Sequence, residues 1–180
     1  IGWDDDDAPL CGMISRLVRQ KGLDILIPAI PDILALGARV VIIGKGEPAF
    51  EERLSSMDAE FPGRFRALLT YDERLAHSAY AGGDIFLMPS DFEPCGLSQL
   101  ISLRYGSVPV VRAVGGLADT ILDADASPDG YGFTFDDYSA EALTTAVSRA
   151  IGAFRETERW DGIRTRGTGI SSDIESTIVP

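Results

Sequence analysis

The sequence predicts an α/β fold, built on a parallel sheet of about six strands with helices on both faces. Two observations predict it. Short apolar runs alternate with amphipathic stretches along most of the chain, and strand candidates recur at intervals of about 20–25 residues. The 180 residues are 45% apolar and carry a formal net charge of −12. This composition is globular, predicts one domain, and argues against a nucleic-acid-binding or membrane-binding surface.

Six runs of residues are candidate strands. The fourth and fifth give the strongest signals, and the third and sixth the weakest. They are Leu10–Ile14, Arg39–Ile43, Phe65–Leu69, Asp84–Pro89, Val108–Val111 and Gly132–Phe135. A parallel sheet covered on both faces binds ligands beyond the carboxyl ends of its strands. The residues that follow each strand are therefore the first candidates for a functional site.

Five stretches between the strands predict helices. In Leu23–Leu34 the apolar residues follow one helix face, but Pro28 and Pro31 are expected to kink the helix or split it in two. The other four are rich in helix formers or begin with a capping residue: Glu47–Glu60, Asp72–Ala81, Cys95–Tyr105 and Ser139–Arg155. We expect a domain over residues 1–160 and a polar tail over 161–180. The sequence leaves open whether this tail is disordered.

Three cations follow the first strand within six residues, in a chain that is otherwise acidic: Arg16, Arg19 and Lys21. They form either a solvated loop or an anion site, and their place at the carboxyl end of a strand favours the anion site. Arginine offers a planar fork of donors, and lysine offers a mobile point charge. We therefore expect a small basic pocket for a phosphorylated ligand.

The segment after the fourth strand, Ser90–Leu97, is the most distinctive in the chain. Pro94 fits the first position of a helix, and Gly96 leaves nearby backbone N–H groups unobstructed. The carboxylate of Glu93 either caps this helix or accepts hydrogen bonds from the hydroxyl groups of a ligand. The residues alone leave both interpretations open.

The remaining strand ends give weaker signals. The loop Gly44–Gly46 lacks the GxGxxG fingerprint, and Gly115 with Gly116 permits either a turn or a close approach to a ligand. Tyr71 either stacks on a base or packs at the rim. The single histidine, His77, is expected to be structural. With one histidine, two distant cysteines and no Ser-His-Asp arrangement in reach, hydrolase triads and zinc sites are disfavoured. The two cysteines form no disulfide framework, so a reducing compartment is expected.

Three segments, taken together, resemble bacterial glycogen synthases and plant starch synthases: SRLVRQKGLD, YDERLAHSAYAGGDIFLMPSDFEPCGLSQL and YGSVPVVRAVGGLADTI. The resemblance runs from about Leu10 to Asp123 and implies the Rossmann-like C-terminal half of a GT-B glycosyltransferase. The family's N-terminal domain carries a Lys-Thr-Gly-Gly-Leu loop and a catalytic-site histidine, which do not occur here. With Ile1 as the first residue, we expect a fragment that lacks this domain.

The resemblance implies a role for each matching residue. Arg16 and Lys21 would grip the diphosphate of the donor, and Glu93 would hold the transferred glucose by its hydroxyl groups. These three are the expected catalytic residues, and Tyr71 would pack against the adenine. The other expected binding residues would line the turn beneath the sugar and phosphates and the next loop of the cleft: Cys95, Gly96, Leu97, Ser98, Gly115, Gly116 and Leu117.

The reaction implied by the resemblance is transfer of glucose from ADP-glucose to the non-reducing end of an α-1,4-glucan, with retention at the anomeric carbon. The expected partners are ADP-glucose or ADP, the glucan acceptor and the missing N-terminal domain. No metal, cofactor, nucleic acid or membrane is expected. A lone half offers one wall of the cleft, so we expect it to be inactive by itself. The expected location is the bacterial cytoplasm, with the plastid stroma as the alternative.

Three features depart from the family pattern. Ile101 stands where related glycosyltransferases often have a second Glu, Val114 replaces a usual Thr, and residues 164–180 contain no aromatic residue. Two alternatives therefore stay open: a non-catalytic nucleotide-binding or scaffold domain, and a related GT-B enzyme that uses another nucleotide sugar. An NAD-dependent oxidoreductase is disfavoured because the glycine fingerprint is missing.

Overall fold

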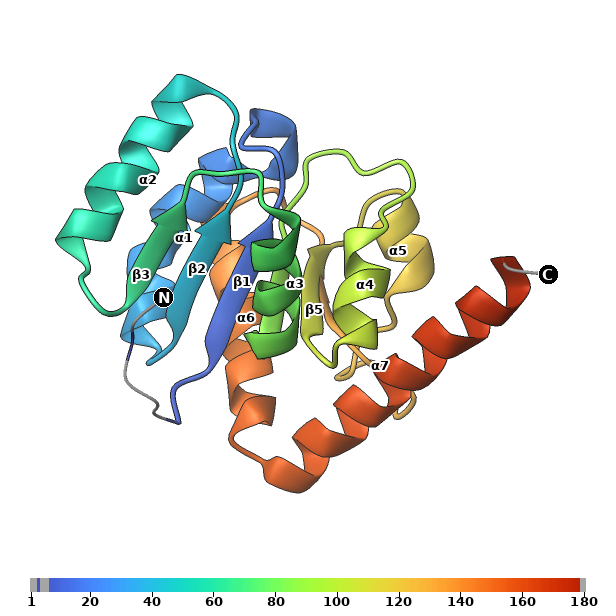
Figure 1. Cartoon of the computed structure of the whole chain (residues 1–180). Helices are drawn as coiled ribbons and strands as arrows, with labels where there is room; N and C mark the ends of the chain where they lie inside the picture. Colours follow the sequence, from blue (N-terminus) through green and yellow to red (C-terminus); the bar gives the residue numbers. More distant parts are fainter. Residues whose placement is uncertain (1–2, 4–6, 179–180) are drawn as a thin grey trace.

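The computed structural model describes residue 3 and residues 7–178, with side chains described as far as residue 170. A sheet of six parallel strands runs through the molecule, and helices lie on both of its faces (Figure 1). The strands are β1 (Leu10–Ile14), β2 (Arg39–Ile43), β3 (Phe65–Leu68), β4 (Ile85–Met88), β5 (Val108–Arg112) and β6 (Phe133–Phe135). The predicted fold class is confirmed.

The strand order places β1, the first strand in the chain, at the centre of the sheet. The order is β3-β2-β1-β4-β5-β6, and every neighbouring pair is parallel. The chain winds outward from β1 on one side and then outward from β4 on the other. The point where the winding reverses lies between β1 and β4, and ligands of such sheets bind in the crevice beyond it.

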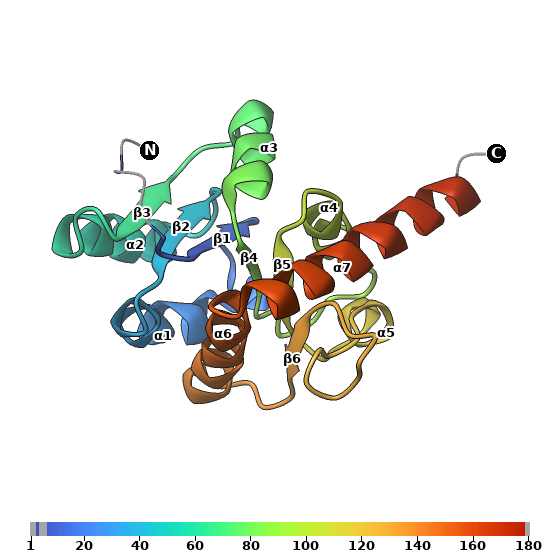
Figure 2. The same cartoon turned by 90° about the horizontal axis from the view of Figure 1, so that it is seen from below.

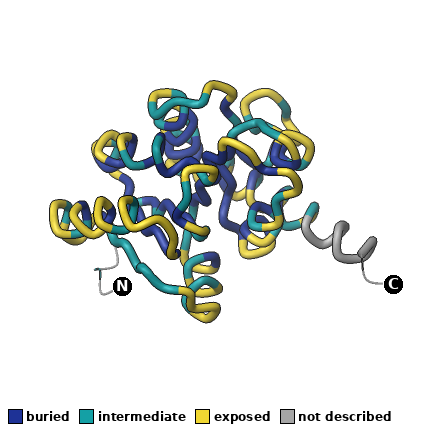
Figure 3. The backbone as a smooth tube through the Cα atoms, turned by 90° about the horizontal axis from the view of Figure 1, so that it is seen from above, coloured by how far each residue is buried: buried dark blue, intermediate teal, exposed yellow. Residues whose placement is uncertain are grey.

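Helices enclose one apolar core on each face of the sheet. The larger core lies under α1, α2 and α6, and the smaller core lies under α3, α4 and α5 (Figure 2). Figure 3 shows the buried residues gathered in the interior of the molecule and the exposed residues on its outside. The bounds are α1 (Leu23–Ala35), α2 (Pro48–Glu60), α3 (Glu73–Gly82), α4 (Ser98–Arg104), α5 (Gly116–Thr120), α6 (Ala140–Phe154) and α7 (Thr157–Ile178).

The first helix is continuous, so of the two expected effects of its prolines, a kink or a split in two, the split is wrong. Pro28 and Pro31 both lie inside α1, on its exposed side. There the carbonyl groups that lose an N–H partner can be hydrated, and a helix can curve around the core. The opposite side is buried in the larger core through Leu26, Ile30 and Ile33. This burial holds the two halves of the helix together.

The other predicted elements are confirmed, with small shifts at their ends. α4 begins at Ser98 rather than Cys95, because Gly96 adopts a left-handed φ of 66° that no helix contains. The predicted caps are present: Asp72 accepts a hydrogen bond from the N–H of Leu75, and Ser139 caps α6 in the same way. The 3₁₀ turn η1 (Arg19–Lys21) and the short helix α5 are additional elements that the sequence patterns do not indicate.

The residues assigned above to a polar tail continue the helix α7, which crosses the molecule near the amino ends of the strands (Figure 1). Ile163 is buried in the larger core. Gly167 lets α7 approach α4, since a Cβ there would lie 2.6 Å from Leu103 Cδ2. Arg164 Nε donates to the carbonyl of Gly106 at 3.0 Å. Residues 161–170 thus pack on the domain through glycine and arginine contacts, although their composition is polar.

None of the helices in the described part of the chain is long and apolar enough to cross a membrane.

Candidate functional site

The loops that follow β1 and β4 are joined at the point where the winding of the sheet reverses. The backbone N–H of Asp91 donates to the carbonyl of Gln20 at 2.9 Å. The side-chain amide of Gln20 donates to the carbonyl of Phe92 at 3.1 Å. The segment predicted as an anion site and the segment that contains Glu93 therefore lie side by side.

Lys21 and Glu93 form an ion pair in this crevice. Lys21 Nζ lies 2.5 Å from Glu93 Oε2, and the two side chains are only 20% and 10% exposed. The Ser90 hydroxyl donates to the same carboxylate oxygen at 3.2 Å. Because both charges are largely withdrawn from water, each is stabilised by the other. α4 begins without a side-chain cap, so Glu93 does not cap that helix.

Gly22 allows α1 to begin close to β4. Its φ is 81°, in the left-handed region, and a Cβ at this position would lie 2.0 Å from the carbonyl oxygen of Pro89. Only glycine meets both conditions, the backbone angle and the close approach. The turn that carries Lys21 is thereby fixed against the strand that leads to Glu93.

The glycine pair after β5 packs on the backbone of the Glu93 loop. The N–H of Gly116 donates to the carbonyl of Glu93 at 3.0 Å. A Cβ on Gly115 would lie 2.3 Å from the Glu93 carbonyl oxygen, and one on Gly116 would lie 2.0 Å from that of Cys95. The close approach that these glycines permit is therefore to the neighbouring loop. The Leu117 side chain is buried in the smaller core.

The segment from Cys95 to Ser98 is partly open and partly tied to the domain. The Cys95 thiol is free and its residue exposed, and Leu97 is 69% exposed. The carbonyl of Gly96 accepts a hydrogen bond from Gln99 Nε2 at 2.9 Å. Burial raises the pKa of Tyr80, and a hydrogen bond with Ser98 opposes this shift. The Ser98 hydroxyl thus has a partner within the domain.

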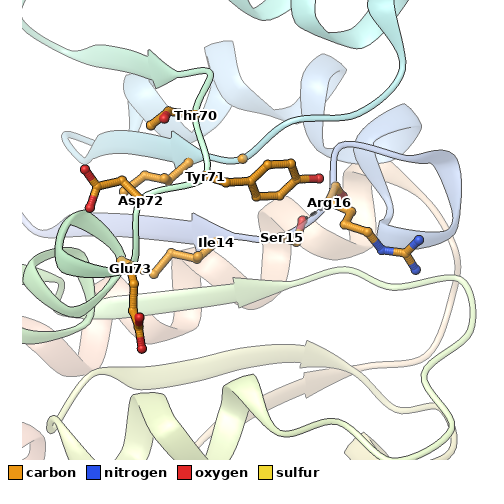
Figure 4. A pocket seen from close by; sticks show the side chains of 10 residues that line it. Ile14, Ser15, Arg16, Thr70, Tyr71, Asp72 and Glu73 are labelled. Atoms are coloured by element: carbon orange, nitrogen blue, oxygen red, sulfur yellow. Dashed lines mark hydrogen bonds between the residues drawn. The ribbon is translucent and has the colours of Figure 1, made fainter.

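A cavity of about 470 Å³ lies beyond the ends of β1 and β2, beside the start of α3 (Figure 4). Arg16 and Tyr71 both line it. The Tyr71 hydroxyl donates to the carbonyl of Lys45 at 3.0 Å, and the residue is 68% exposed. Figure 4 shows the ring lying across the cavity with its hydroxyl toward the Arg16 end. The ring is therefore held at one point and open to a ligand elsewhere.

The structure places the predicted residues in two groups at one edge of the sheet. Lys21, Glu93 and the glycine pair lie at the crevice between β1 and β4, and Arg16 and Tyr71 lie at the neighbouring cavity. The loop after β1 belongs to both groups. Within the described ranges, no three His, Cys, Asp or Glu side chains come together to hold a metal ion. The edge offers cations, a carboxylate and an aromatic ring, which suit a ligand with phosphate, hydroxyl and planar groups.

Two side chains at this edge are not indicated by the sequence patterns. Arg112 ends β5; its Nη1 donates to the carbonyl of Asp91 at 2.9 Å and its Nε to that of Asp136 at 3.0 Å. Its guanidinium lies 4.9 Å from the centre of the Tyr138 ring. The position of Arg112, directly after a buried strand, is a signal that could have identified it. Tyr138 follows the weakest strand and carries no comparable signal.

Tyr138 extends this contact to the first helix. Its hydroxyl donates to Asp24 Oδ1 at 2.5 Å, and Asp24 Oδ2 lies 3.2 Å from Arg19 Nε. Burial and the hydrogen bond to the Asp24 carboxylate raise the pKa of Tyr138. The hydroxyl therefore keeps its proton at neutral pH and remains a donor.

Comparison with known proteins identifies relatives of the chain. The family model described as "Glycosyl transferases group 1" matches residues 8–152. A glycogen synthase from Anaeromyxobacter dehalogenans is 52% identical over 161 residues, which are 89% of this chain and 34% of that protein. A glycogen synthase from Desulfitobacterium hafniense is 46% identical over 172 residues, which are 94% of this chain and 36% of that protein. The chain thus spans about a third of the length of these curated relatives.

A solved structure agrees with the fold over nearly the whole chain. The catalytic domain of starch synthase IV from Arabidopsis thaliana, bound to ADP and acarbose, matches with a TM-score of 0.85 and 32% identity. The match covers 97% of this chain and 39% of that domain. The resemblance to glycogen and starch synthases, which three sequence segments indicate, is confirmed.

Proposed function

The chain belongs to the group 1 glycosyl transferases, and we propose that it is the donor-binding domain of a retaining glucosyltransferase of the glycogen or starch synthase type. In the proposed reaction, glucose passes from ADP-glucose to the non-reducing end of an α-1,4-glucan. The names of the relatives and the ADP bound in the starch synthase structure support this choice. The observation that carries the proposal is the ion pair of Lys21 and Glu93 between β1 and β4.

In this proposal Lys21 acts on the diphosphate of the donor. An ammonium group has three N–H donors, so Lys21 can keep its bond to Glu93 and donate to a phosphate oxygen as well. As the bond between the anomeric carbon and the phosphate breaks, negative charge grows on the leaving ADP. A fixed cation at that position stabilises the transition state more than the ground state. Arg16 contributes a second cation from the same loop.

Glu93 acts on the glucose in this proposal. Its carboxylate accepts hydrogen bonds from the sugar hydroxyls and orients the ring with its anomeric carbon toward the acceptor. The transition state resembles an oxocarbenium ion, as in glycoside hydrolysis, and the departing phosphate balances its charge. The burial of Glu93 and its bonds to Lys21 and Ser90 support this role, because they hold the carboxylate in one position before the donor arrives.

The adenine of the donor occupies the cavity of about 470 Å³ in this proposal. The exposed face of the Tyr71 ring offers a surface on which a base can stack. Arg16, at the same cavity and on the same loop as Lys21, is placed between the base and the diphosphate site. This arrangement supports a nucleotide that spans the two groups of residues.

Calorimetric titration with ADP and UDP tests the proposal. Lys21→Ala removes a charge-assisted hydrogen bond of about 1.5–3 kcal/mol, which predicts a loss of about 10–150-fold in ADP affinity. Lys21→Gln retains a donor for Glu93 and separates loss of charge from loss of folding. Arg53→Ala, at the exposed pair with Glu60 on α2, is the matched control for net charge and is expected to bind ADP as the unsubstituted chain does.

Two results would contradict the assignment of the donor site. Unchanged ADP affinity in both Lys21 variants would remove Lys21 from the diphosphate site. Tighter binding of UDP than of ADP would favour a related enzyme with another nucleotide sugar. Circular dichroism on the same samples verifies that each variant is folded.

A further inference from the structure

Arg112, Tyr138 and Asp24, which we call the Arg112 strap, form a continuous line of contacts across the carboxyl edge of the sheet. They come from the end of β5, from the loop between β6 and α6, and from the first turn of α1. The Arg112 guanidinium stacks on the Tyr138 ring, and the Tyr138 hydroxyl donates to the Asp24 carboxylate. The strap therefore joins segments that are far apart in the sequence.

Each end of the strap reaches a loop that carries one member of the Lys21–Glu93 pair. At one end Arg112 binds the carbonyl of Asp91, two residues before Glu93. At the other end Asp24 pairs with Arg19, two residues before Lys21. The two loops also bond to each other between Asp91 and Gln20. The loop after β1 and the loop after β4 are therefore connected in two ways, through the strap and through the direct hydrogen bond.

The turn η1, which carries Lys21, makes few stabilising contacts within itself. η1 contains no buried residue, and its first end has no side-chain cap. A 3₁₀ turn of this length is not stable alone, and a lysine side chain has large rotamer freedom. The position of Lys21 Nζ therefore depends on contacts made from outside the turn.

We propose that the Arg112 strap positions Lys21 and Glu93 for the donor, so that Arg112 and Tyr138 are positioning residues of the site. This inference rests on the proposed function of the Lys21–Glu93 pair. Arg112 suits the role because its planar fork reaches two carbonyl groups while its face lies on the ring. A lysine cannot make all three contacts. Tyr138 suits it because its hydroxyl is the link to Asp24 and the turn.

The chain has two lysines, Lys21 and Lys45, so an NMR signal from each lysine side chain can report directly on the surroundings of Lys21. Reductive methylation with ¹³C-formaldehyde keeps the positive charge and gives one NMR signal for each lysine, besides that of the terminal amine. Lys45→Arg assigns the two signals. In the unsubstituted chain, the Lys21 signal is expected to lie apart from that of exposed Lys45, since Lys21 is paired and largely buried.

Tyr138→Phe and Arg112→Gln, neither of which adds a lysine, are expected to move the Lys21 signal toward that of Lys45. The same variants are expected to raise the Kd for ADP about three- to tenfold, the effect of one ordinary hydrogen bond. Tyr131→Phe is the matched control, because the Tyr131 hydroxyl likewise donates a hydrogen bond within the domain, to the carbonyl of Thr120 at 3.0 Å. It is expected to change neither the Lys21 signal nor the Kd.

The outcomes separate this proposal from the proposed function. An unmoved Lys21 signal in Tyr138→Phe and Arg112→Gln overturns the positioning role, even where the melting temperature of the variants is lowered. If the unmethylated chain does not bind ADP in the calorimetric titration, the donor-site proposal is wrong. In that case the signals recorded without ADP still decide whether the strap holds Lys21.

Discussion

Gly22 and Gly63 both have left-handed backbone angles, but their surroundings differ. Their φ values are 81° and 75°. A Cβ on Gly22 would meet the carbonyl oxygen of Pro89 at 2.0 Å, whereas nothing lies within 4 Å of one on Gly63. Alanine at Gly63 therefore tests backbone strain alone. Alanine at Gly22 adds a collision between the start of α1 and the end of β4.

We predict that Gly63→Ala lowers the free energy of unfolding by about 1 kcal/mol. Gly22→Ala is expected to lower it by about 3 kcal/mol or more, because the backbone of β4 cannot move aside without breaking the sheet. It is also expected to weaken ADP binding, since Lys21 is the preceding residue. Urea denaturation followed by circular dichroism measures both changes. Equal losses at the two positions would show that the close approach at Gly22 has no energetic importance.

At the residue scale, the sequence indicated which side chains the site contains but not which of them contact one another. Lys21 and Glu93 stood out because cations and a carboxylate follow strands, yet their pairing depends on β1 and β4 being neighbours. Arg112 and Tyr138 were missed, although the position of Arg112 at the end of a strand was a local signal. Their contacts join loops whose proximity is set by the order of the strands, and that order is not visible in local patterns.

At the scale of the element, α1 shows how burial on one side overrides local propensity. Two prolines interrupt its hydrogen-bond ladder, but both lie on the exposed side while the opposite side is in the larger core. Pro48 provides a natural comparison, because it stands in the first turn of α2, where the missing N–H has no intrahelical partner to lose.

We predict that Pro31→Ala raises the free energy of unfolding by about 1 kcal/mol. The restored N–H bonds the carbonyl of Ile27, and this gain exceeds the added flexibility of the unfolded chain. Pro48→Ala is expected to be neutral or slightly destabilising. Thermal and urea unfolding of the two variants measures both changes in the free energy of unfolding. A loss of stability in Pro31→Ala would mean that the restriction which Pro31 places on the unfolded chain outweighs the restored hydrogen bond.

Helix α7 shows where composition misleads at this scale. Its polar residues and glycines indicated a tail, but Gly167 provides close contact with Leu103, and Arg164 binds a backbone carbonyl. A glycine in a packed helix and a glycine in a flexible segment look alike in the sequence. Only the neighbour that approaches the glycine distinguishes them.

At the scale of the whole molecule, the regular alternation of strands and helices predicted the α/β class and all six strands. The period of the apolar runs carries this information, because each run must be buried between two layers of helices. The order of the strands in the sheet could not be predicted from the sequence and was established by the structure. The chain spans about a third of its glycogen synthase relatives, so the acceptor and the transfer step are matters for the longer protein.

We predict that the chain by itself elongates no glucan with ADP-glucose. One wall of a cleft binds the nucleotide but does not place the acceptor against the anomeric carbon. Addition of the N-terminal part of a glycogen synthase relative is expected to restore incorporation of labelled glucose into glucan, and Glu93→Gln in the present chain is expected to abolish it. Activity of the chain alone would contradict the prediction. ADP binding without restored transfer would favour the scaffold alternative.

During synthesis, β1 and β2 leave the ribosome before β4, which follows only after β3 and α3. One edge of β1, with the backbone groups of Cys11 and Gly12, has no partner until β4 arrives. An unpaired edge of this kind invites pairing with another nascent chain. The crevice of Lys21 and Glu93 is created in the same step that closes this edge. The arrival of β4 thus covers the open edge of β1 and brings Glu93 beside Lys21 in a single folding event.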